Sequence, residues 1–347
     1  SAGEPVMPQE PFLVLRDLAK SFGPVAALRS VSLSVGPDEL LVVLGPTGAG
    51  KTTLLRTIAG LETPDSGRVE MAGRDVTNAA PAERDVALVF QNFSLYPDRT
   101  VRGNLEFPLR APGRGLSKAE IAERVEWAAR LLRIERLLDR KSNRLSGGEM
   151  QRVAIGRAIV RRPRLFLMDE PLTNLDAKLR EGLRVELTCL RRELGIPMVF
   201  VTHDQDEALS MGDRVVVLQE GRVLQTGTPE EVYRRPANPE VARQLGQPSI
   251  NLIEVDSGTA AGGVRLPGAA AAPGPHLAGI RPEDLRPRGG AHRGVVQVVE
   301  DVGASQILLV DWSGTTIHIL TSKAEAFRPG DEVHPQPDPD RVLAWPR

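Results

Sequence analysis

A glycine-rich segment of the chain ends in a lysine and two threonines, and it lies between a strongly apolar run and a helical run. Glycines let the backbone curl so that successive N–H groups point inward, and the start of a helix adds positive potential. The segment therefore predicts a phosphate cradle in which Lys51 reaches the β- and γ-phosphates and Thr52 binds Mg²⁺. The expected nucleotide-binding residues here are Gly45, Pro46, Thr47, Gly48, Ala49, Gly50, Lys51, Thr52 and Thr53.

Two acids follow a second apolar run, which covers residues 165–168. Asp169 is placed to hold Mg²⁺ through water, and Glu170 is placed to orient and deprotonate an attacking water. Two acids that merely cap a strand are the alternative interpretation. Because the same chain contains a predicted phosphate cradle, a hydrolytic site is the better interpretation of these two acids.

The elements that must position these residues alternate between short apolar runs and helical patterns, from about residue 12 to residue 245. The runs favour strands buried on both faces of a parallel sheet, and the whole pattern predicts an α/β P-loop nucleotide hydrolase domain. Ser117 and Glu120 form a capping box that begins the clearest helix, expected over residues 118–140. The largely helical insertion at about residues 92–163 is expected to form a subdomain. The expected strands cover residues 40–44, 86–90, 165–168, 198–202 and 215–218.

The amino-acid composition and the pattern of apolar residues change after residue 247. Residues 256–278 are rich in Gly, Ala and Pro and are expected to form a loop or linker. Short alternating runs then predict a small β-barrel or sandwich. We therefore expect one domain at residues 11–246 and a second at residues 247–347. The expected strands of the second domain cover residues 294–300, 306–311, 315–320 and 341–345.

Composition narrows the classes of protein further. The 44 Lys and Arg residues nearly balance the 45 Asp and Glu residues, which leaves a net charge of −1. The single cysteine, Cys189, excludes an internal disulfide, and its helical surroundings predict a small core residue. The strongly apolar runs are far shorter than the ~20 residues of a membrane span. Any role at a membrane is therefore expected to act through a partner.

Residues 145–152, Leu-Ser-Gly-Gly-Glu-Met-Gln-Arg, narrow the choice among nucleotide hydrolases. They resemble the LSGGQ signature of ABC-transporter ATPases, with Glu in place of the usual Gln. They also begin a predicted helix, where free N–H groups and the helix dipole favour a bound anion. The resemblance implies that this segment acts on the nucleotide of a second subunit, either an identical copy or a close paralogue. The residues concerned are Leu145, Ser146, Gly147, Gly148 and Glu149.

The other motifs of this family follow in order along the chain. Gln91 matches the Q-loop glutamine, which contacts Mg²⁺ together with Thr52 and Asp169 and senses the γ-phosphate. Asp176 lies in a match to the D-loop, which crosses the dimer interface. His203 matches the switch histidine, which contacts the γ-phosphate. The resemblance thus implies ATP and Mg²⁺ as the bound groups.

Phe22 matches the aromatic residue that stacks on adenine, where Tyr is commoner in the family. An ordinary core phenylalanine is the alternative interpretation of this residue. Thr173 stands where a serine is more usual, just before the D-loop.

Two segments resemble the importer branch of the family. Residues 279–283, Gly-Ile-Arg-Pro-Glu, look like the regulatory-domain motif of maltose-type importer ATPases, whose accessory domain is an OB-like β-barrel. Residues 94–101 resemble the segment that receives coupling helices of the membrane subunits, with Asp98-Arg99 in place of the usual His-Met. The resemblance implies the ATP-hydrolysing subunit of an ABC importer, peripheral at the cytoplasmic face of the membrane. Its partners would be membrane permease subunits and an extracytoplasmic solute-binding protein, and its solute a sugar or related polyol.

Several alternatives stay open at this point. A polyamine or inorganic-ion importer is the nearest one. Three other classes fit less well. A soluble non-transport ABC ATPase usually has two cassettes or a coiled-coil insertion, and neither is seen here. An exporter would lack the β-barrel, and other P-loop enzymes would lack the signature. Nucleic acid is not an expected partner, because residues 248–347 hold nine basic and twelve acidic side chains, a net charge of −3. The barrel either widens the dimer interface or also binds a regulator.

Overall fold

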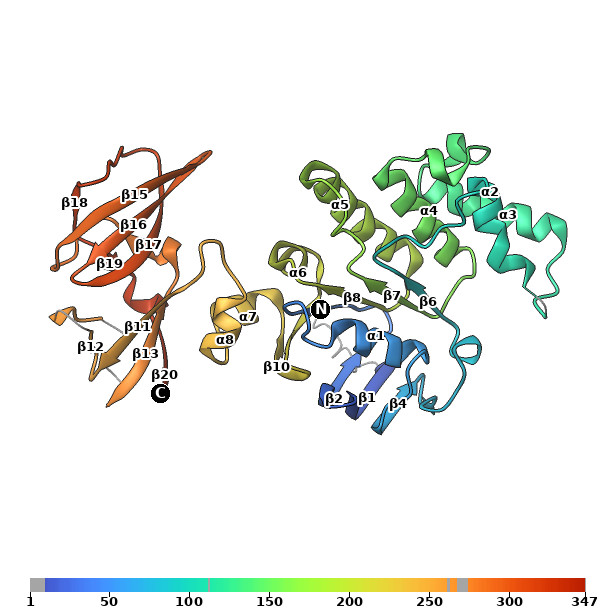
Figure 1. Cartoon of the computed structure of the whole chain (residues 1–347), viewed down its shortest axis with the longest axis horizontal. Coiled ribbons are helices and arrows are strands. Elements are labelled where there is room, and N and C mark those ends of the chain that lie inside the picture. Colours follow the sequence, from blue (N-terminus) through green and yellow to red (C-terminus); the bar gives the residue numbers. More distant parts are fainter. Residues whose placement is uncertain (1–9, 112, 261–262, 267–273, 347) are drawn as a thin grey trace, which may run out of the picture. The chain divides into compact units, whose positions relative to one another are not determined.

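The computed structural model describes residues 10–111, 113–260, 263–266 and 274–346 (Figure 1). The chain divides into two compact units, Ser1–Pro229 and Glu230–Arg347. This division falls earlier in the chain than the boundary at 246/247 that the composition favours.

The N-terminal unit is built on a six-stranded sheet in the order β10-β9-β3-β8-β7-β6. All neighbouring strands are parallel except β10, which pairs antiparallel with β9. The three strands β3, β7 and β8 are buried at every residue, as near-continuous apolar runs predict. The strands are β3 (Leu40–Leu44), β6 (Val86–Val89), β7 (Leu165–Asp169), β8 (Met198–Thr202), β9 (Arg214–Gln219) and β10 (Arg222–Gly227).

A second, antiparallel sheet has the order β2-β1-β4-β5, and the sequence analysis did not predict it. Its buried side chains belong to the same apolar cluster as those of the parallel sheet and of helix α1 (Lys51–Ala59). Because α1 packs into this shared core, the loop before it is held on a rigid support. The strands of this sheet are β1 (Leu13–Phe22), β2 (Val25–Val35), β4 (Ser66–Met71) and β5 (Arg74–Asp75).

Helices α2, α3 and α4 pack against one another in the insertion between β6 and β7 (Figure 1). Helix α3 ends at Leu131, earlier than expected, because Arg133 adopts a left-handed φ of 56° and a separate 3₁₀ turn follows at Glu135–Leu137. Cys189 is exposed on α5, so the prediction of a core cysteine is wrong. The helices are α2 (Val101–Glu106), α3 (Lys118–Leu131), α4 (Gly147–Ile159), α5 (Ala177–Leu194) and α6 (Gln205–Met211).

The C-terminal unit holds small antiparallel sheets that share one apolar core. Helices α7 (Pro229–Arg234) and α8 (Pro239–Arg243) precede them. The expected linker is partly strand, since β12 and β13 lie in it, while residues 261–262 and 267–273 lie outside the described part. The strands are β11 (Asn251–Asp256), β12 (Thr259–Ala260), β13 (Pro275–Ile280), β14 (Leu285–Arg286), β15 (Gly294–Val302), β16 (Ser305–Trp312), β17 (Thr315–Ser322), β18 (Glu332–Val333), β19 (Gln336–Pro337) and β20 (Leu343–Pro346).

Arg281 fastens the two short helices to the strands of this unit. Arg281 is 4% exposed, and its guanidinium donates hydrogen bonds to the backbone oxygens of Leu245 (2.7 Å) and Tyr233 (2.6 Å). It also lies 3.6 Å from the centre of the Tyr233 ring. Trp345 adds a hydrogen bond of 3.1 Å to the backbone oxygen of Pro236. These contacts explain why residues 230–246 group with the second unit.

Replacing Arg281 with Leu is expected to lower the unfolding free energy of the C-terminal unit by about 2–4 kcal/mol, because buried carbonyl oxygens lose charged donors. Urea unfolding of the full chain measures this change. Arg286→Leu, which alters an exposed arginine of the same unit, is the matched control. Equal stability of the two variants would contradict the anchoring role of Arg281.

Candidate active site

The loop between β3 and α1 requires glycine at two positions. Gly50 has a left-handed φ of 103°, and a Cβ there would lie 2.4 Å from the backbone oxygen of Ala27. A Cβ on Gly45 would lie 2.3 Å from the backbone oxygen of Leu218. The backbone of β9 and β2 therefore leaves no room for a side chain at either end of the loop.

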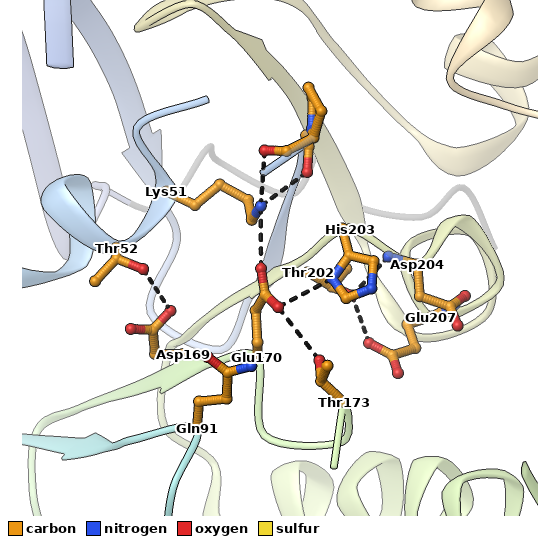
Figure 2. Close-up of polar contacts among 12 residues, drawn as sticks. Lys51, Thr52, Gln91, Asp169, Glu170, Thr173, Thr202, His203, Asp204 and Glu207 are labelled. Carbon is orange, nitrogen blue, oxygen red and sulfur yellow. Dashed lines mark hydrogen bonds and ion pairs between the residues drawn. The ribbon is translucent and has the colours of Figure 1, made fainter. Parts of the chain in front are cut away.

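Lys51 is the first residue of α1, and it is only 5% exposed. Its Nζ donates hydrogen bonds to the backbone oxygens of Gly45 (2.8 Å) and Pro46 (3.0 Å). The same nitrogen lies 3.1 Å from Oε1 of Glu170, at the end of β7 (Figure 2). The ammonium group therefore lies against the glycine loop and joins it to the acidic end of β7.

Thr52 and Asp169 form a second polar contact beside the first (Figure 2). The Thr52 hydroxyl donates a hydrogen bond of 3.1 Å to Oδ1 of Asp169, which is 9% exposed. Burial raises the pKa of Asp169, and the charge of Glu170 adds to the increase, while the Thr52 hydrogen bond opposes it. A buried carboxylate with little compensation and an adjacent hydroxyl match the oxygen ligands that Mg²⁺ prefers, alongside water and phosphate. The donor set therefore fits Mg²⁺.

Gln91 emerges at the same edge of the sheet. Strands β6 and β7 are parallel, with Val89 opposite Met168. The residues that follow β6 therefore lie beside the residues that follow β7. The backbone oxygen of Gln91 accepts a hydrogen bond of 3.0 Å from the side chain of Asn174. The structure thus brings Gln91 to the segment that carries the two acids.

Glu170 is the centre of the cluster. It has a left-handed φ of 45°, and its Oε2 lies 2.9 Å from Nδ1 of His203 and accepts a hydrogen bond of 3.3 Å from Thr173 (Figure 2). Burial raises the pKa of Glu170, but the hydrogen bond and charge of Lys51, followed by those of His203, outweigh it, so the pKa lies below its usual value. Glu170 is therefore an ionised acceptor at neutral pH.

Hydrogen bonds of the neighbouring residue Thr202 hold the loop that carries His203 in place. The Thr202 hydroxyl donates a hydrogen bond of 2.6 Å to the buried carboxylate of Glu207 and accepts one of 2.9 Å from the backbone N–H of Asp204. The Asp204 side chain in turn caps α6 by accepting from the backbone N–H of Asp206. These bonds hold the half-exposed His203 beside Glu170.

Sequence reasoning missed Arg180, which lies on α5 one turn after the helix cap formed by Asp176. Its guanidinium donates to the backbone oxygen of Leu175 (3.1 Å) and to Oδ2 of Asp204 (3.4 Å). Arg180 thus connects the segment around Asp176 with the loop of His203. No sequence signal marks this role, because the contact joins two loops that are distant in the chain.

Two predicted parts of the site make no recorded polar contact with this cluster within the described residues. Phe22 ends β1 and is 47% exposed, which excludes an ordinary core phenylalanine. Ser146 caps α4, and the hydrogen bonds that the structure records for its side chain are made with Glu149. Among the described residues, no recorded hydrogen bond or ion pair joins residues 145–149 to Lys51 or Glu170.

Replacing Asp169 with Asn is expected to raise the melting temperature of the nucleotide-free chain, because a buried and poorly compensated charge disappears. The same change should remove most of the Mg²⁺-dependent stabilisation by ATP, which for a binding-competent chain is about 2.7 kcal/mol at 100 times Kd. Thermal unfolding with ATP and either Mg²⁺ or a chelator measures both effects. An unchanged Mg²⁺-dependent increment would remove Asp169 from the metal site.

Comparison with known families identifies both parts of the chain. Residues 28–173 match the model of the ABC transporter family, and residues 278–345 match the TOBE domain. Fold and site together define an ABC ATPase cassette that carries a C-terminal TOBE domain, which is an OB-like β-barrel.

Curated relatives cover most of the chain. The chain is 48% identical over 307 residues to sn-glycerol-3-phosphate import ATP-binding protein UgpC 3 of Rhizobium johnstonii, with 86% of each protein covered. It is 49% identical to the UgpC protein of Rhizobium meliloti, with 84% of this chain and 85% of the relative covered. The chain therefore belongs to the import ATP-binding proteins of the ABC transporter family. It is an ATPase, the ATP-hydrolysing subunit of an importer, which confirms the family expected from the motifs.

Solved structures show the same cassette. The nucleotide-free ATP-binding cassette of an ABC transporter matches with a TM-score of 0.60 and 28% identity, covering 67% of this chain and 98% of that chain. The dimeric structure of the bacterial cassette MJ0796 matches with a TM-score of 0.56 and 33% identity, covering 62% and 98%. A cassette described in its ADP conformation matches with a TM-score of 0.60, so the family binds adenine nucleotides. In the part of this chain that the structure describes, no helix is both long and apolar enough to cross a membrane.

Proposed function

We propose that two copies of this chain enclose two ATP molecules, each between the residue 45–53 loop of one copy and residues 145–149 of the other. The observation that supports the site is the cluster in which Glu170 contacts both Lys51 and His203. Closure on ATP would move the attached membrane subunits, and hydrolysis would reset them. The dimeric structure of a similar cassette supports the two-copy arrangement.

The residues of the site divide the work of hydrolysis. The loop N–H groups and Lys51 bind the phosphates, and the exposed ring of Phe22 offers a face for adenine. Mg²⁺, which Thr52 and Asp169 would hold with Gln91 beside them, supplies positive charge to the phosphate oxygens. Ionised Glu170 accepts the proton of the attacking water.

His203 and the loop behind it complete the site. The imidazole contacts Glu170 and is 45% exposed, and we infer that it also contacts the γ-phosphate when ATP is bound. Its contact with Glu170 holds the carboxylate while Lys51 turns to the phosphates. The contact between His203 and Glu170 therefore keeps the carboxylate oriented when Lys51 leaves Glu170 and binds the phosphates.

We infer that the solute is sn-glycerol-3-phosphate or a related sugar or polyol. The names of relatives that are 43–49% identical over most of the chain support this class. The chain would act with permease subunits and a solute-binding protein, at the cytoplasmic face of the membrane.

An exposed aromatic pair offers a docking surface for the permease. Tyr96 and Phe107 are 38% and 41% exposed, with ring centres 4.5 Å apart. They lie in and beside the 94–101 segment, and Arg157 covers the Tyr96 ring at 5.6 Å. This pair supports a partner contact at the helical insertion.

The test is to copurify the chain with its permease and binding protein from native membranes and to measure ATPase activity in proteoliposomes. sn-Glycerol-3-phosphate is expected to stimulate activity severalfold, whereas spermidine or sulfate is not. A Glu170→Gln preparation controls for contaminating ATPases. Stimulation by a polyamine or inorganic ion alone would overturn the proposed solute class.

A further inference from the structure

The first turn of α4 contains an additional hydrogen bond in its capping box. The backbone N–H of Ser146 donates to Oε2 of Glu149 at 2.9 Å, and the Ser146 hydroxyl donates to the same oxygen at 3.1 Å. The backbone N–H of Glu149 reaches the hydroxyl oxygen at the long distance of 3.4 Å. The Ser146 hydroxyl hydrogen is therefore directed toward its own helix.

The capping box at the start of α3 provides an internal comparison. Ser117 and Glu120 have the same residue types at the same spacing, with backbone-to-side-chain bonds of 2.7 and 3.2 Å. Hydrogen bonds from the backbone N–H of Ser117, followed by its side chain, lower the pKa of Glu120, so the two capping boxes are built alike. What distinguishes the α4 box is its position at residues 145–149, which are proposed to meet the opposite nucleotide, so Glu120 serves as the matched control.

Glu149 also carries a negative charge at this position. The hydrogen bond from the backbone of Ser146 lowers the pKa of Glu149, and burial opposes it only in part, so the group is ionised at neutral pH. Its other oxygen lies 3.8 Å from Arg140, which is half exposed and therefore compensates the charge weakly. A carboxylate accepts but cannot donate, so it holds the hydroxyl hydrogen and repels a phosphate.

We propose that Glu149 restrains ATP-driven closure of the dimer by holding the Ser146 hydroxyl and by repelling the opposite nucleotide. The inference rests on the proposed function, in which residues 145–149 meet the nucleotide of the other subunit. A glutamine at this position keeps the cap, because its amide oxygen still accepts from the Ser146 N–H. Its NH₂ group can donate to the hydroxyl oxygen, which frees the hydroxyl hydrogen for a phosphate.

The test compares Glu149→Gln with Glu120→Gln in the full chain. Glu149→Gln is expected to lower the ATP concentration for half-maximal dimer closure about three- to fivefold, the range of a partly screened surface charge. Light scattering in a Glu170→Gln background measures closure, and the apparent KM for ATP in the otherwise native chain should fall in parallel. The gain should shrink as salt is raised. Glu120→Gln should change neither value.

Two further measurements separate this role from a structural one. Both glutamine variants remove one charge from a helix start, so their melting temperatures should fall by the same small amount. Arg140→Gln leaves Glu149 less compensated and should raise the ATP concentration needed for closure. A structural role alone predicts no gain in ATP affinity from any of these changes.

The outcomes distinguish this inference from the function on which it rests. If the reference chain closes on ATP and Glu149→Gln closes at the same or a higher ATP concentration, the inference about Glu149 is overturned and the dimer stands. If the reference chain binds ATP and does not dimerise at any concentration, the proposed dimer and the inference fail together.

Discussion

Glu170→Gln is expected to bind MgATP normally and to lose at least about 100-fold in ATP turnover, the scale of a positioned general base. The amide preserves the shape of the side chain, but it cannot accept the proton of the attacking water. The structure supports this assignment because the carboxylate is ionised and is held by Lys51 and His203. Phosphate release and equilibrium ATP binding measure the two effects separately.

The matched control changes an acid outside the site. Glu126→Gln alters a glutamate of α3 that pairs with Arg102 at the surface, and it should leave turnover unchanged. If Glu170→Gln hydrolysed ATP at nearly the native rate, Glu170 would not be the base.

Lys51→Met should act on binding as well as on rate. The ammonium offsets phosphate charge, and a hydrogen bond to a charged group is worth about 1.5–3 kcal/mol, or about 10- to 100-fold in affinity. Isothermal titration with MgATP measures the loss. Lys118→Met, at the exposed start of α3, is the control. Unchanged MgATP affinity in Lys51→Met would contradict the phosphate-binding role.

The same variant should alter the pH dependence of stability in the nucleotide-free chain. A carboxylate whose pKa is lowered in the folded state adds stability above its ordinary pKa, and this stability is lost as pH falls through the folded pKa. Lys51 provides the largest contribution that lowers the pKa of Glu170. Its removal should therefore reduce stability at neutral pH more than at acidic pH.

The strand, loop and helix that we propose as a phosphate cradle could be predicted from sequence because they are local. A strand, a glycine loop and a helix at fixed spacing place Lys51 and Thr52 without information from the rest of the chain. The acids at the end of β7 were predictable for a related reason. Parallel strands bring their carboxyl ends to one edge, so Asp169 had to lie near the loop after β3.

Features that depend on distant pairing could not be predicted. The strands β1 and β2 carry several register shifts, which disturb the alternation that marks a strand. Arg281 acts through backbone oxygens of remote residues, which leave no trace in a sequence, and Arg180 reaches the side chain of Asp204 on a different loop. The exposure of Cys189 depends on which face of α5 is covered, which only packing decides.

A disulfide crosslink tests the composite site most directly. Cysteines at positions 47 and 146 replace Thr47 and Ser146 in a chain that also carries Cys189→Ser, which removes the exposed native thiol, and Glu170→Gln, which retains ATP. We expect an oxidative crosslink between two chains that forms with MgATP and does not form without nucleotide or with either single cysteine. A crosslink confined to one chain, or one that forms equally without ATP, would contradict the two-subunit site.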